Sequence, residues 1–285
     1  MRYPEIISIP NNPSLHAMAE VLPDVVYSTA TGQDLTLRLI VPWAQEGQAL
    51  PRRPLIIFVQ GSAWTTPNLN YQLPQLARYA QFGHVVATLT HRDSAQGHAF
   101  PAYLQDVKTA IRFLRANADT YGIDPERVCI FGTSSGGNTA LLVGLTSDDP
   151  RYETDEYGDH SDAVSTVISC FGPTDMPGII AGHEEEWAGN PIFAGLLVDK
   201  SPREVMLGMS PLLEIKPGQS YPPFLLAHGD ADDVVPFSQS ETMFHALIDA
   251  GVDARLIKVI GAPHEGNFWS NRLFGLIADF LRETL

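Results

Sequence analysis

A short apolar segment in the middle of the chain runs directly into a glycine-flanked serine. Residues 127–132 read Arg-Val-Cys-Ile-Phe-Gly, which is typical of a buried strand, and residues 132–136 read Gly-Thr-Ser-Ser-Gly. A nucleophile on a sharp turn from a strand into a helix requires small residues two positions before and after it, because larger side chains would collide. Ser134 meets this requirement, whereas Ser135 would have Thr133 at the earlier position. The pattern predicts that Ser134 is a nucleophile between a strand and a helix.

Strand-like and helix-like segments alternate from about residue 54 to the end of the chain. Such alternation is typical of a mostly parallel sheet with helices on both faces. Before it, two segments with alternating apolar residues predict an antiparallel edge pair. The length suits one large α/β domain spanning residues 1–285. The predicted strands are 24–29, 34–41, 54–61, 84–90, 127–132, 164–172, 223–230 and 254–260, and the predicted helices are 102–119, one from about 135, 237–250 and 267–283.

Two stretches interrupt the alternation. Residues 176–220 are rich in Gly and Pro and carry Trp187, Phe193 and several Met. Ligands in open α/β sheets bind at the carboxyl ends of the strands, so we interpret this stretch as a small cap rather than an inert connection. Residues 148–162 carry seven carboxylates. Their spacing does not match the EF-hand pattern, so we expect a solvated acidic loop rather than a calcium loop.

A serine hydroxyl needs a base to activate it and a carboxylate to orient that base. In this kind of fold the chain order is Ser, then Asp or Glu, then His. His245 lies within a helical pattern, whereas His264 follows a strand in the loop Gly-Ala-Pro-His-Glu-Gly, so we favour His264. The loop His-Gly-Asp-Ala-Asp-Asp-Val-Val-Pro, which follows strand residues 223–228, contains three aspartates. Spacing alone does not choose among Asp230, Asp232 and Asp233.

The oxyanion of a tetrahedral intermediate needs two hydrogen-bond donors. One is expected to be the backbone N–H of Ser135, directly after the nucleophile, and the other to come from the loop after strand 54–61. That loop reads Gln-Gly-Ser-Ala-Trp at residues 60–64, and its small residues allow a substrate to approach the backbone closely. A plain tight turn is the alternative interpretation of the loop.

The composition excludes several classes of protein. The formal net charge is -15, which disfavours binding to nucleic acid and to anionic membranes. Cys129 and Cys170 each lie in an apolar run and are expected to be buried thiols. No signal peptide and no apolar run of membrane-spanning length is evident, so a cytoplasmic protein is expected. The nine histidines show no zinc-ligand spacing, and we expect no metal site.

Five stretches together resemble the bacterial α/β-hydrolases of the BD-FAE type (bifunctional feruloyl and acetyl xylan esterases), which are related to hormone-sensitive-lipase-like and arylformamidase-like esterases. The resemblance covers roughly residues 54–270. It implies an α/β-hydrolase fold and a catalytic triad of Ser134, Asp232 and His264, because the family's acid precedes two residues and then Val-Pro. The stretches that carry it are 100–128, 132–145, 171–176, 222–240 and 261–266.

The family's oxyanion loop usually reads His-Gly-Gly-x-Trp, and the chain departs from it twice. Gln60 replaces the histidine that braces the loop, and Ser62 replaces a glycine. An amide can brace the loop too, and a serine narrows its backbone freedom. The resemblance places the loop's backbone donors at Ser62 and Ala63, beside that of Ser135.

We therefore predict a carboxylic ester hydrolase that works through an acyl-enzyme, without metal or organic cofactor. The expected partner is a small-molecule ester, either a feruloyl- or chlorogenate-type hydroxycinnamoyl ester or a short acetyl ester, with Trp64, Trp187 and Phe193 as candidate pocket residues. A homodimer is compatible with the sequence, although no feature argues for one. The alternatives are an arylformamidase-like amidase, a peptidase and a non-catalytic ligand-binding homologue.

Overall fold

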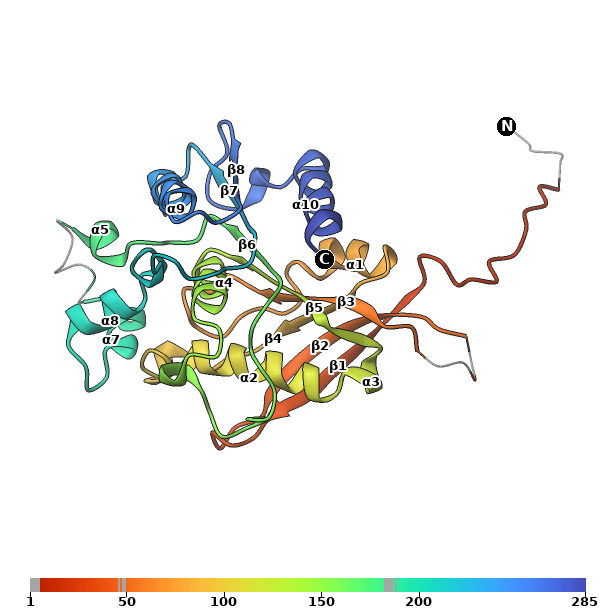
Figure 1. The fold of residues 1–285 in the computed structure, drawn as a ribbon, viewed down its shortest axis with the longest axis horizontal. Coiled ribbons are helices and arrows are strands. Elements are labelled where there is room, and N and C mark those ends of the chain that lie inside the picture. The colour runs from red at the N-terminus through yellow and green to blue at the C-terminus, as the bar shows by residue number, and fades with distance from the viewer. Residues whose placement is uncertain (1–5, 46, 48–49, 182–186, 188) are drawn as a thin grey trace.

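The structure is a computed structural model that describes residues 6–45, 47, 50–181, 187 and 189–285. Its centre is one eight-stranded sheet in the order β1-β2-β4-β3-β5-β6-β7-β8 (Figure 1). β1 pairs with β2 and β2 with β4 in antiparallel fashion, and every other neighbouring pair is parallel. The strands are β1 Ala19–Ser28, β2 Leu35–Pro42, β3 Arg53–Val59, β4 Val85–Leu89, β5 Ile123–Thr133, β6 Thr166–Cys170, β7 Phe224–Gly229 and β8 Ala254–Val259.

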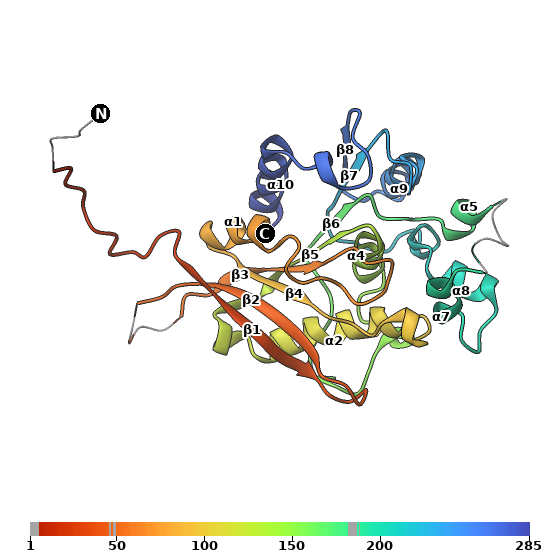
Figure 2. The ribbon, with the colours of Figure 1, turned by 180° about the vertical axis from the view of Figure 1, so that it is seen from behind.

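Helices cover both faces of the sheet, so that two separate cores form (Figure 2). Along β3, Leu55 and Ile57 pack into the core with α2, α4 and α9, whereas Ile56 and Phe58 pack into the core with α1 and α10. Because successive side chains of a strand point to opposite faces, a strand buried on both sides must be apolar throughout. The main helices are α1 Leu73–Gln81, α2 Ala102–Ala116, α3 Ala118–Tyr121, α4 Ser135–Leu145, α9 Ser238–Asp249 and α10 Asn271–Thr284.

The predicted strands and the antiparallel edge pair are all present, with ends shifted by a few residues. The sequence analysis missed helix α1 and several shorter helices, among them α3 and those between β6 and β7. Leu73, Leu76 and Ala80 lie at helical spacing, and Pro74 fits the first turn, where its missing N–H has no partner to lose. Cys129 and Cys170 are buried free thiols, as predicted.

Between β6 and β7 the chain forms α5 Met176–Ile180, α7 Pro191–Leu196 and α8 Pro202–Gly208. Part of the predicted cap, residues 182–186 and 188, lies outside the described residues. The helices gather beyond the carboxyl end of β6, at one end of the sheet (Figure 1). A short 3₁₀ helix, Pro211–Glu214, follows them before β7, and the other 3₁₀ helices are Ser94–Gln96, Pro150–Tyr152 and Gly266–Phe268.

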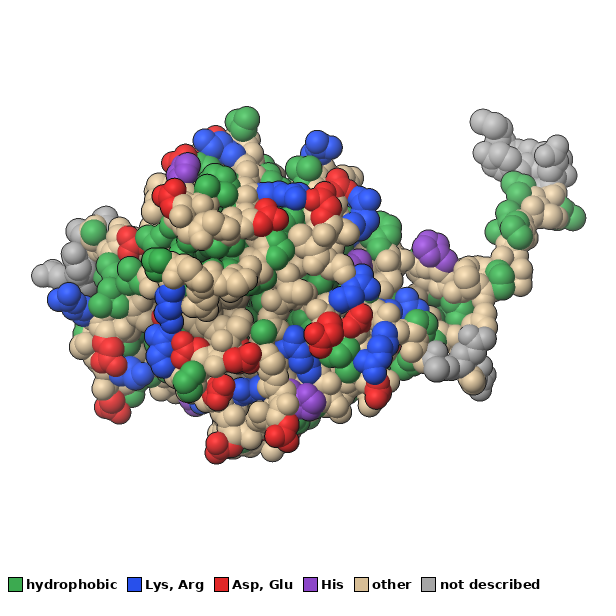
Figure 3. Space-filling model, in the orientation of Figure 1, with side chains coloured by type: hydrophobic (Ala, Val, Ile, Leu, Met, Phe, Trp, Pro, Cys, Tyr) green, Lys and Arg blue, Asp and Glu red, His purple; other side chains and the backbone are tan. Residues whose placement is uncertain are grey.

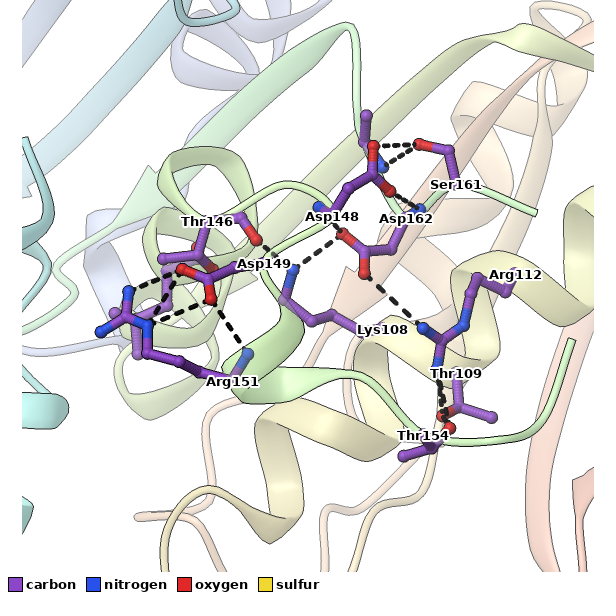
Figure 4. Close-up of polar contacts among 12 residues, drawn as sticks. Lys108, Thr109, Arg112, Thr146, Asp148, Asp149, Arg151, Thr154, Ser161 and Asp162 are labelled. Carbon is purple, nitrogen blue, oxygen red and sulfur yellow. Dashed lines mark hydrogen bonds and ion pairs between the residues drawn. The ribbon is translucent and has the colours of Figure 1, made fainter. Parts of the chain in front are cut away.

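The acidic stretch is only partly the solvated loop that was expected. Asp162 is 1% exposed, and its carboxylate accepts a hydrogen bond from the Lys108 ammonium at 2.7 Å, inside the protein (Figure 4). Arg112 of α2 lies 3.9 Å from the other oxygen of the same carboxylate. The prediction was wrong for Asp162, because a cation buried in α2 requires a nearby anion. The exposed carboxylates Glu153, Asp155 and Asp159 fit it.

On the molecular face in Figure 3, acidic and basic side chains are intermixed. Among the residues that the structure describes, no helix has both the length and the apolar character needed to cross a bilayer.

Candidate active site

Ser134 occupies a sharp turn between β5 and α4. Its backbone has φ 50° and ψ −122°, a conformation that non-glycine residues rarely adopt. A Cβ on Gly132 would lie 2.0 Å from the carbonyl oxygen of Gly136, and one on Gly136 would lie 2.0 Å from that of Val59. Any larger residue at these two positions would collide with the backbone, so both must be glycine. The strained turn places Ser134 just beyond the carboxyl end of β5.

Three side chains from the ends of different strands form a continuous hydrogen-bonded row. His264, after β8, has its Nε2 3.0 Å from Ser134 Oγ and its Nδ1 2.7 Å from Asp232 Oδ2, after β7. A carboxylate only accepts, so Nδ1 carries the proton and Nε2 is free to accept the serine proton. This is the arrangement that makes a serine hydroxyl nucleophilic.

Besides His264, three other groups bind the carboxylate of Asp232. Its side chain is fully buried, and its Oδ1 accepts the backbone N–H groups of Val234 and Val235 at 2.9 and 2.8 Å. Buried His228 lies with Nε2 3.2 Å from Asp232 Oδ2. Burial by itself would raise the pKa of Asp232, but hydrogen bonds from His228, His264 and the two N–H groups lower it well below its usual range. The carboxylate therefore stays ionised.

The imidazole of His228 is held in place through both of its ring nitrogens. Its Nε2 faces two pure acceptors, Asp232 Oδ2 and the Val235 carbonyl at 2.9 Å, so that nitrogen carries the proton. Its Nδ1 forms a hydrogen bond of 2.7 Å with the hydroxyl of Ser240. Sequence reasoning missed His228, although a histidine in the apolar strand Phe-Leu-Leu-Ala-His was a visible signal.

The competing candidates from the sequence lie apart from this row. Asp230 is exposed, and its carboxylate accepts the N–H of Gly261 at 2.6 Å. Asp233 is exposed in the same loop. His245 is exposed on α9 beside the ring of Phe244.

The loop after β3 is fastened to the turn that carries the nucleophile. The Gly61 N–H donates to Thr133 Oγ1 at 2.9 Å, and the Ser62 N–H donates to Ser135 Oγ at 2.9 Å. The Ser62 hydroxyl donates to the Thr65 carbonyl at 2.6 Å. Ser62, which the resemblance suggested as an oxyanion donor, thus has its N–H occupied within the protein. No protein acceptor is recorded for the N–H of Ala63 among the described residues.

Gln60 does not brace this loop by hydrogen bonding. The residue is only 5% exposed, yet its side-chain amide has no hydrogen-bond partner among the described residues. The hydroxyls of Thr133 and Ser135 do the bracing, and neither role was visible in the sequence.

Two pockets meet at Ser134. The first, which we call the acyl pocket, has a volume of about 250 Å³ and is mainly apolar. Phe193 contacts both tryptophans in it, with ring centroids 3.8 Å from Trp187 and 6.3 Å from Trp64. All three candidate pocket residues from the sequence therefore lie together beside the nucleophile. Met176 and Ile179 of α5 complete the apolar lining.

The second, which we call the alcohol pocket, has a volume of about 470 Å³ and is lined by His264 and several polar residues. Among them is Glu265, whose backbone has φ 68°. Its carboxylate accepts from Trp269 Nε1 at 2.8 Å and from Gln72 Nε2 at 3.3 Å. Burial raises the pKa of Glu265. Sequence reasoning missed Glu265, since a residue beside a catalytic histidine carries no pattern of its own.

The chain is similar to known esterases in sequence and structure. The BD-FAE family model matches residues 43–247. Esterase LipC of Mycobacterium tuberculosis is 30% identical over 213 residues, which cover 74% of this chain and 52% of LipC. The chain spans about half the length of such curated relatives, with 57% of LipQ and 43% of LipM covered.

Solved structures of similar proteins cover nearly the whole chain. A truncated carbohydrate esterase from gut microbiota superposes with a TM-score of 0.77 at 29% identity, covering 96% of this chain and 99% of that one. The propionate-bound esterase 2 of Thermogutta terrifontis superposes with a TM-score of 0.75 at 26% identity, covering 99% and 97%. These matches and the sheet topology confirm the predicted fold: the chain belongs to the BD-FAE family of α/β-hydrolase esterases.

Proposed function

We propose that the chain hydrolyses carboxylic esters through a Ser134 acyl-enzyme. The observation that carries the proposal is the hydrogen-bonded row from Ser134 Oγ through His264 to the buried carboxylate of Asp232. Similarity to LipC and to the solved esterases supports the same activity.

In the proposed reaction, His264 Nε2 takes the proton of Ser134 as its oxygen attacks the ester carbonyl carbon. Asp232 stabilises the imidazolium that forms. The imidazolium then protonates the alcohol oxygen, the carbon–oxygen bond breaks, and an acyl-serine remains. Water, deprotonated by His264, attacks the acyl-serine and releases the acid.

We propose that the backbone N–H groups of Ala63 and Ser135 hold the oxyanion. The Ser62 N–H is already bound to Ser135 Oγ, which supports Ala63 as the loop's donor. Ser135 begins α4, so its N–H also has the favourable field of a helix N-terminus. In this proposal Ser62 holds the loop in place through its own hydrogen bonds and does not bind the substrate.

For the acyl group we propose a small or aromatic acid, of the acetyl or hydroxycinnamoyl kind. The apolar lining of the acyl pocket and its three aromatic rings support this choice. Aromatic rings prefer edge-to-face or offset neighbours, which the Trp64 and Trp187 side chains can offer to a cinnamoyl ring.

The test is a set of methyl esters that share one alcohol: methyl ferulate, methyl p-coumarate and methyl acetate, with wild type, Ser134→Ala and Trp187→Ala. We expect wild type to cleave at least one ester and Ser134→Ala to cleave none. The ferulate-to-acetate ratio of kcat/KM distinguishes the two acyl classes, and Trp187→Ala should lower it if the ring binds the cinnamoyl group. Wild-type cleavage of formanilides but not esters would indicate the amidase instead, and ligand binding without turnover would indicate a non-catalytic homologue.

A further inference from the structure

The two pockets differ in their access to the proton donor. In the proposed reaction, the leaving alcohol takes its proton from His264 Nε2, so it must lie where His264 is exposed. His264 lines the alcohol pocket and does not line the acyl pocket. This inference rests on the proposed function, and it gives the alcohol a site of its own, with polar side chains that the reaction itself does not use.

Gln60 is the first of these side chains. It is 95% buried, lines the alcohol pocket and has no side-chain hydrogen-bond partner among the described residues. The amide atoms are not fully enclosed by protein, because they border the alcohol pocket, and polar groups in such places are normally paired with water or with a ligand. The amide can donate to and accept from a hydroxyl group of a bound alcohol.

Glu265 is the second. Trp269 Nε1–H fixes one of its oxygens at 2.8 Å, while the other has only the longer contact of 3.3 Å from Gln72. This second oxygen therefore keeps room to accept a further hydrogen bond.

Glu265 also brings a carboxylate to the wall of the alcohol pocket itself. Among the described residues that line the two pockets, only Glu265 and His264 have ionisable groups that charge near neutral pH, and His264 must be neutral to act as a base. The chain's net charge of -15 adds to the same negative field.

We infer that Gln60 and Glu265 determine the alcohol specificity of the enzyme. They favour an alcohol that carries a hydroxyl group or a positive charge near the ester oxygen, and they disfavour one that carries a carboxylate.

The charge is tested with three acetate esters that share the acyl group and the deacylation step: acetylcholine, its neutral isostere 3,3-dimethylbutyl acetate, and O-acetylglycolate. For wild type we expect kcat/KM to fall in that order. Glu265→Gln keeps an oxygen for Trp269 and should reduce the ratio of cationic to anionic ester by about tenfold, as expected for one partly screened charge at short range. Glu241→Gln, an exposed change on α9, is the matched control and should leave the ratio unchanged.

The hydrogen bonds are tested with 2-hydroxyethyl acetate against propyl acetate, which differ by one hydroxyl in place of a methyl. Wild type should prefer the hydroxylated ester, and Gln60→Met should reduce that preference by about threefold to tenfold, the value of one neutral hydrogen bond.

The inference is overturned if wild type cleaves the cationic and anionic esters equally well, or if Glu265→Gln slows all three esters by one common factor. A common factor would mean that Glu265 acts through His264. The wild-type ratio needs no variant, so the test stands even if Glu265→Gln does not fold. Absence of any wild-type ester hydrolysis would overturn the proposed function itself.

Discussion

The carboxylates of Asp162 and Asp232 are both fully buried, but the groups that surround them differ, and so do the roles that we assign to them. Asp162 faces the cationic side chains of Lys108 and Arg112, so its negative charge is compensated in the resting protein (Figure 4). Asp232 faces two imidazoles and two backbone N–H groups. Its charge is solvated by dipoles but not cancelled. It remains available to a cation that forms only during the reaction.

The comparison teaches that burial alone does not identify a functional acid. A buried carboxylate beside a permanent cation connects elements: Asp162 joins the loop after α4 to α2. A buried carboxylate beside a neutral base stores an interaction that strengthens when the base takes a proton. Four predictions break or sharpen this contrast, and we take them from the largest expected effect to the smallest.

Replacing Asp232 by Asn should have the largest effect. The amide can donate to His264 Nδ1 and so favour the wrong tautomer, and kcat should fall by about 10⁴, the loss seen for this change in other triads. The chain should still fold, because the amide oxygen accepts from Val234 and Val235, but the melting temperature should fall, because the amide NH₂ replaces the oxygen that faces His228. Steady-state kinetics on p-nitrophenyl acetate check the first, and calorimetry the second. A loss of less than tenfold in kcat would contradict the role given to Asp232.

Replacing Asp162 by Asn should show the opposite pattern. Lys108 would lose its anionic partner inside the protein, and removing one partner of a buried ion pair costs about 3–5 kcal/mol of unfolding free energy. Urea unfolding measures the loss, while kcat of the folded fraction should stay near that of wild type. The double variant Lys108→Met/Asp162→Asn serves as the control: its loss should be smaller than the sum of the two single losses. Additive losses would show that the pair does not interact.

The hydroxyls of Thr133 and Ser135 are neutral counterparts of these carboxylates. Thr133→Val keeps the shape and removes the acceptor for the Gly61 N–H, and Thr133→Ser restores it. We expect Thr133→Val and Ser135→Ala to lower kcat about 10- to 100-fold with little change in KM, because a displaced oxyanion donor matters only in the transition state. Weaker inhibition by a boronic acid should accompany the loss. Equal activity of Thr133→Val and Thr133→Ser would exclude this role.

Glu265 should give the smallest effect. Its pKa is raised by burial, so between the unfolded and folded pKa values the folded chain binds more protons than the unfolded chain. Stability is therefore lost as the pH rises through that window. At pH 7, Glu265→Gln should be more stable than wild type by less than about 1 kcal/mol, since solvent screens a partly exposed group. The difference should vanish near pH 4. A difference that grows towards acid pH would reverse the sign of the shift.

The fold could be predicted from the sequence largely because the inner strands are buried on both faces. Runs such as residues 54–61 leave no polar position that a helix or loop would need, and the alternation in residues 34–41 marks the edge pair. Helix α1 escaped because it is short and has a proline in its first turn.

Chain order and the family resemblance were enough to predict the members of the triad. The orientation of the backbone N–H groups around them could not be predicted from the sequence. The structure brings together Ser134, Asp232 and His264, which chain order and resemblance had selected. Asp232 and Asp230 differ in the backbone N–H groups that bind their carboxylates. The N–H of Val235 holds the buried carboxylate of Asp232, whereas the N–H of Gly261 holds the exposed carboxylate of Asp230. No spacing rule encodes that difference. The same holds for Ser62, whose N–H points at a neighbouring side chain.

Thr133 and Ser135 bind the loop from the two sides of the nucleophile, so the position of the donor loop depends directly on the turn that carries Ser134. On heating, we expect the oxyanion donors and Ser134 to lose their native positions together. Activity and tertiary structure should therefore be lost at the same temperature. We expect no lower temperature at which the chain is folded but inactive. An enzyme built in this way would tolerate warming up to the edge of its own unfolding.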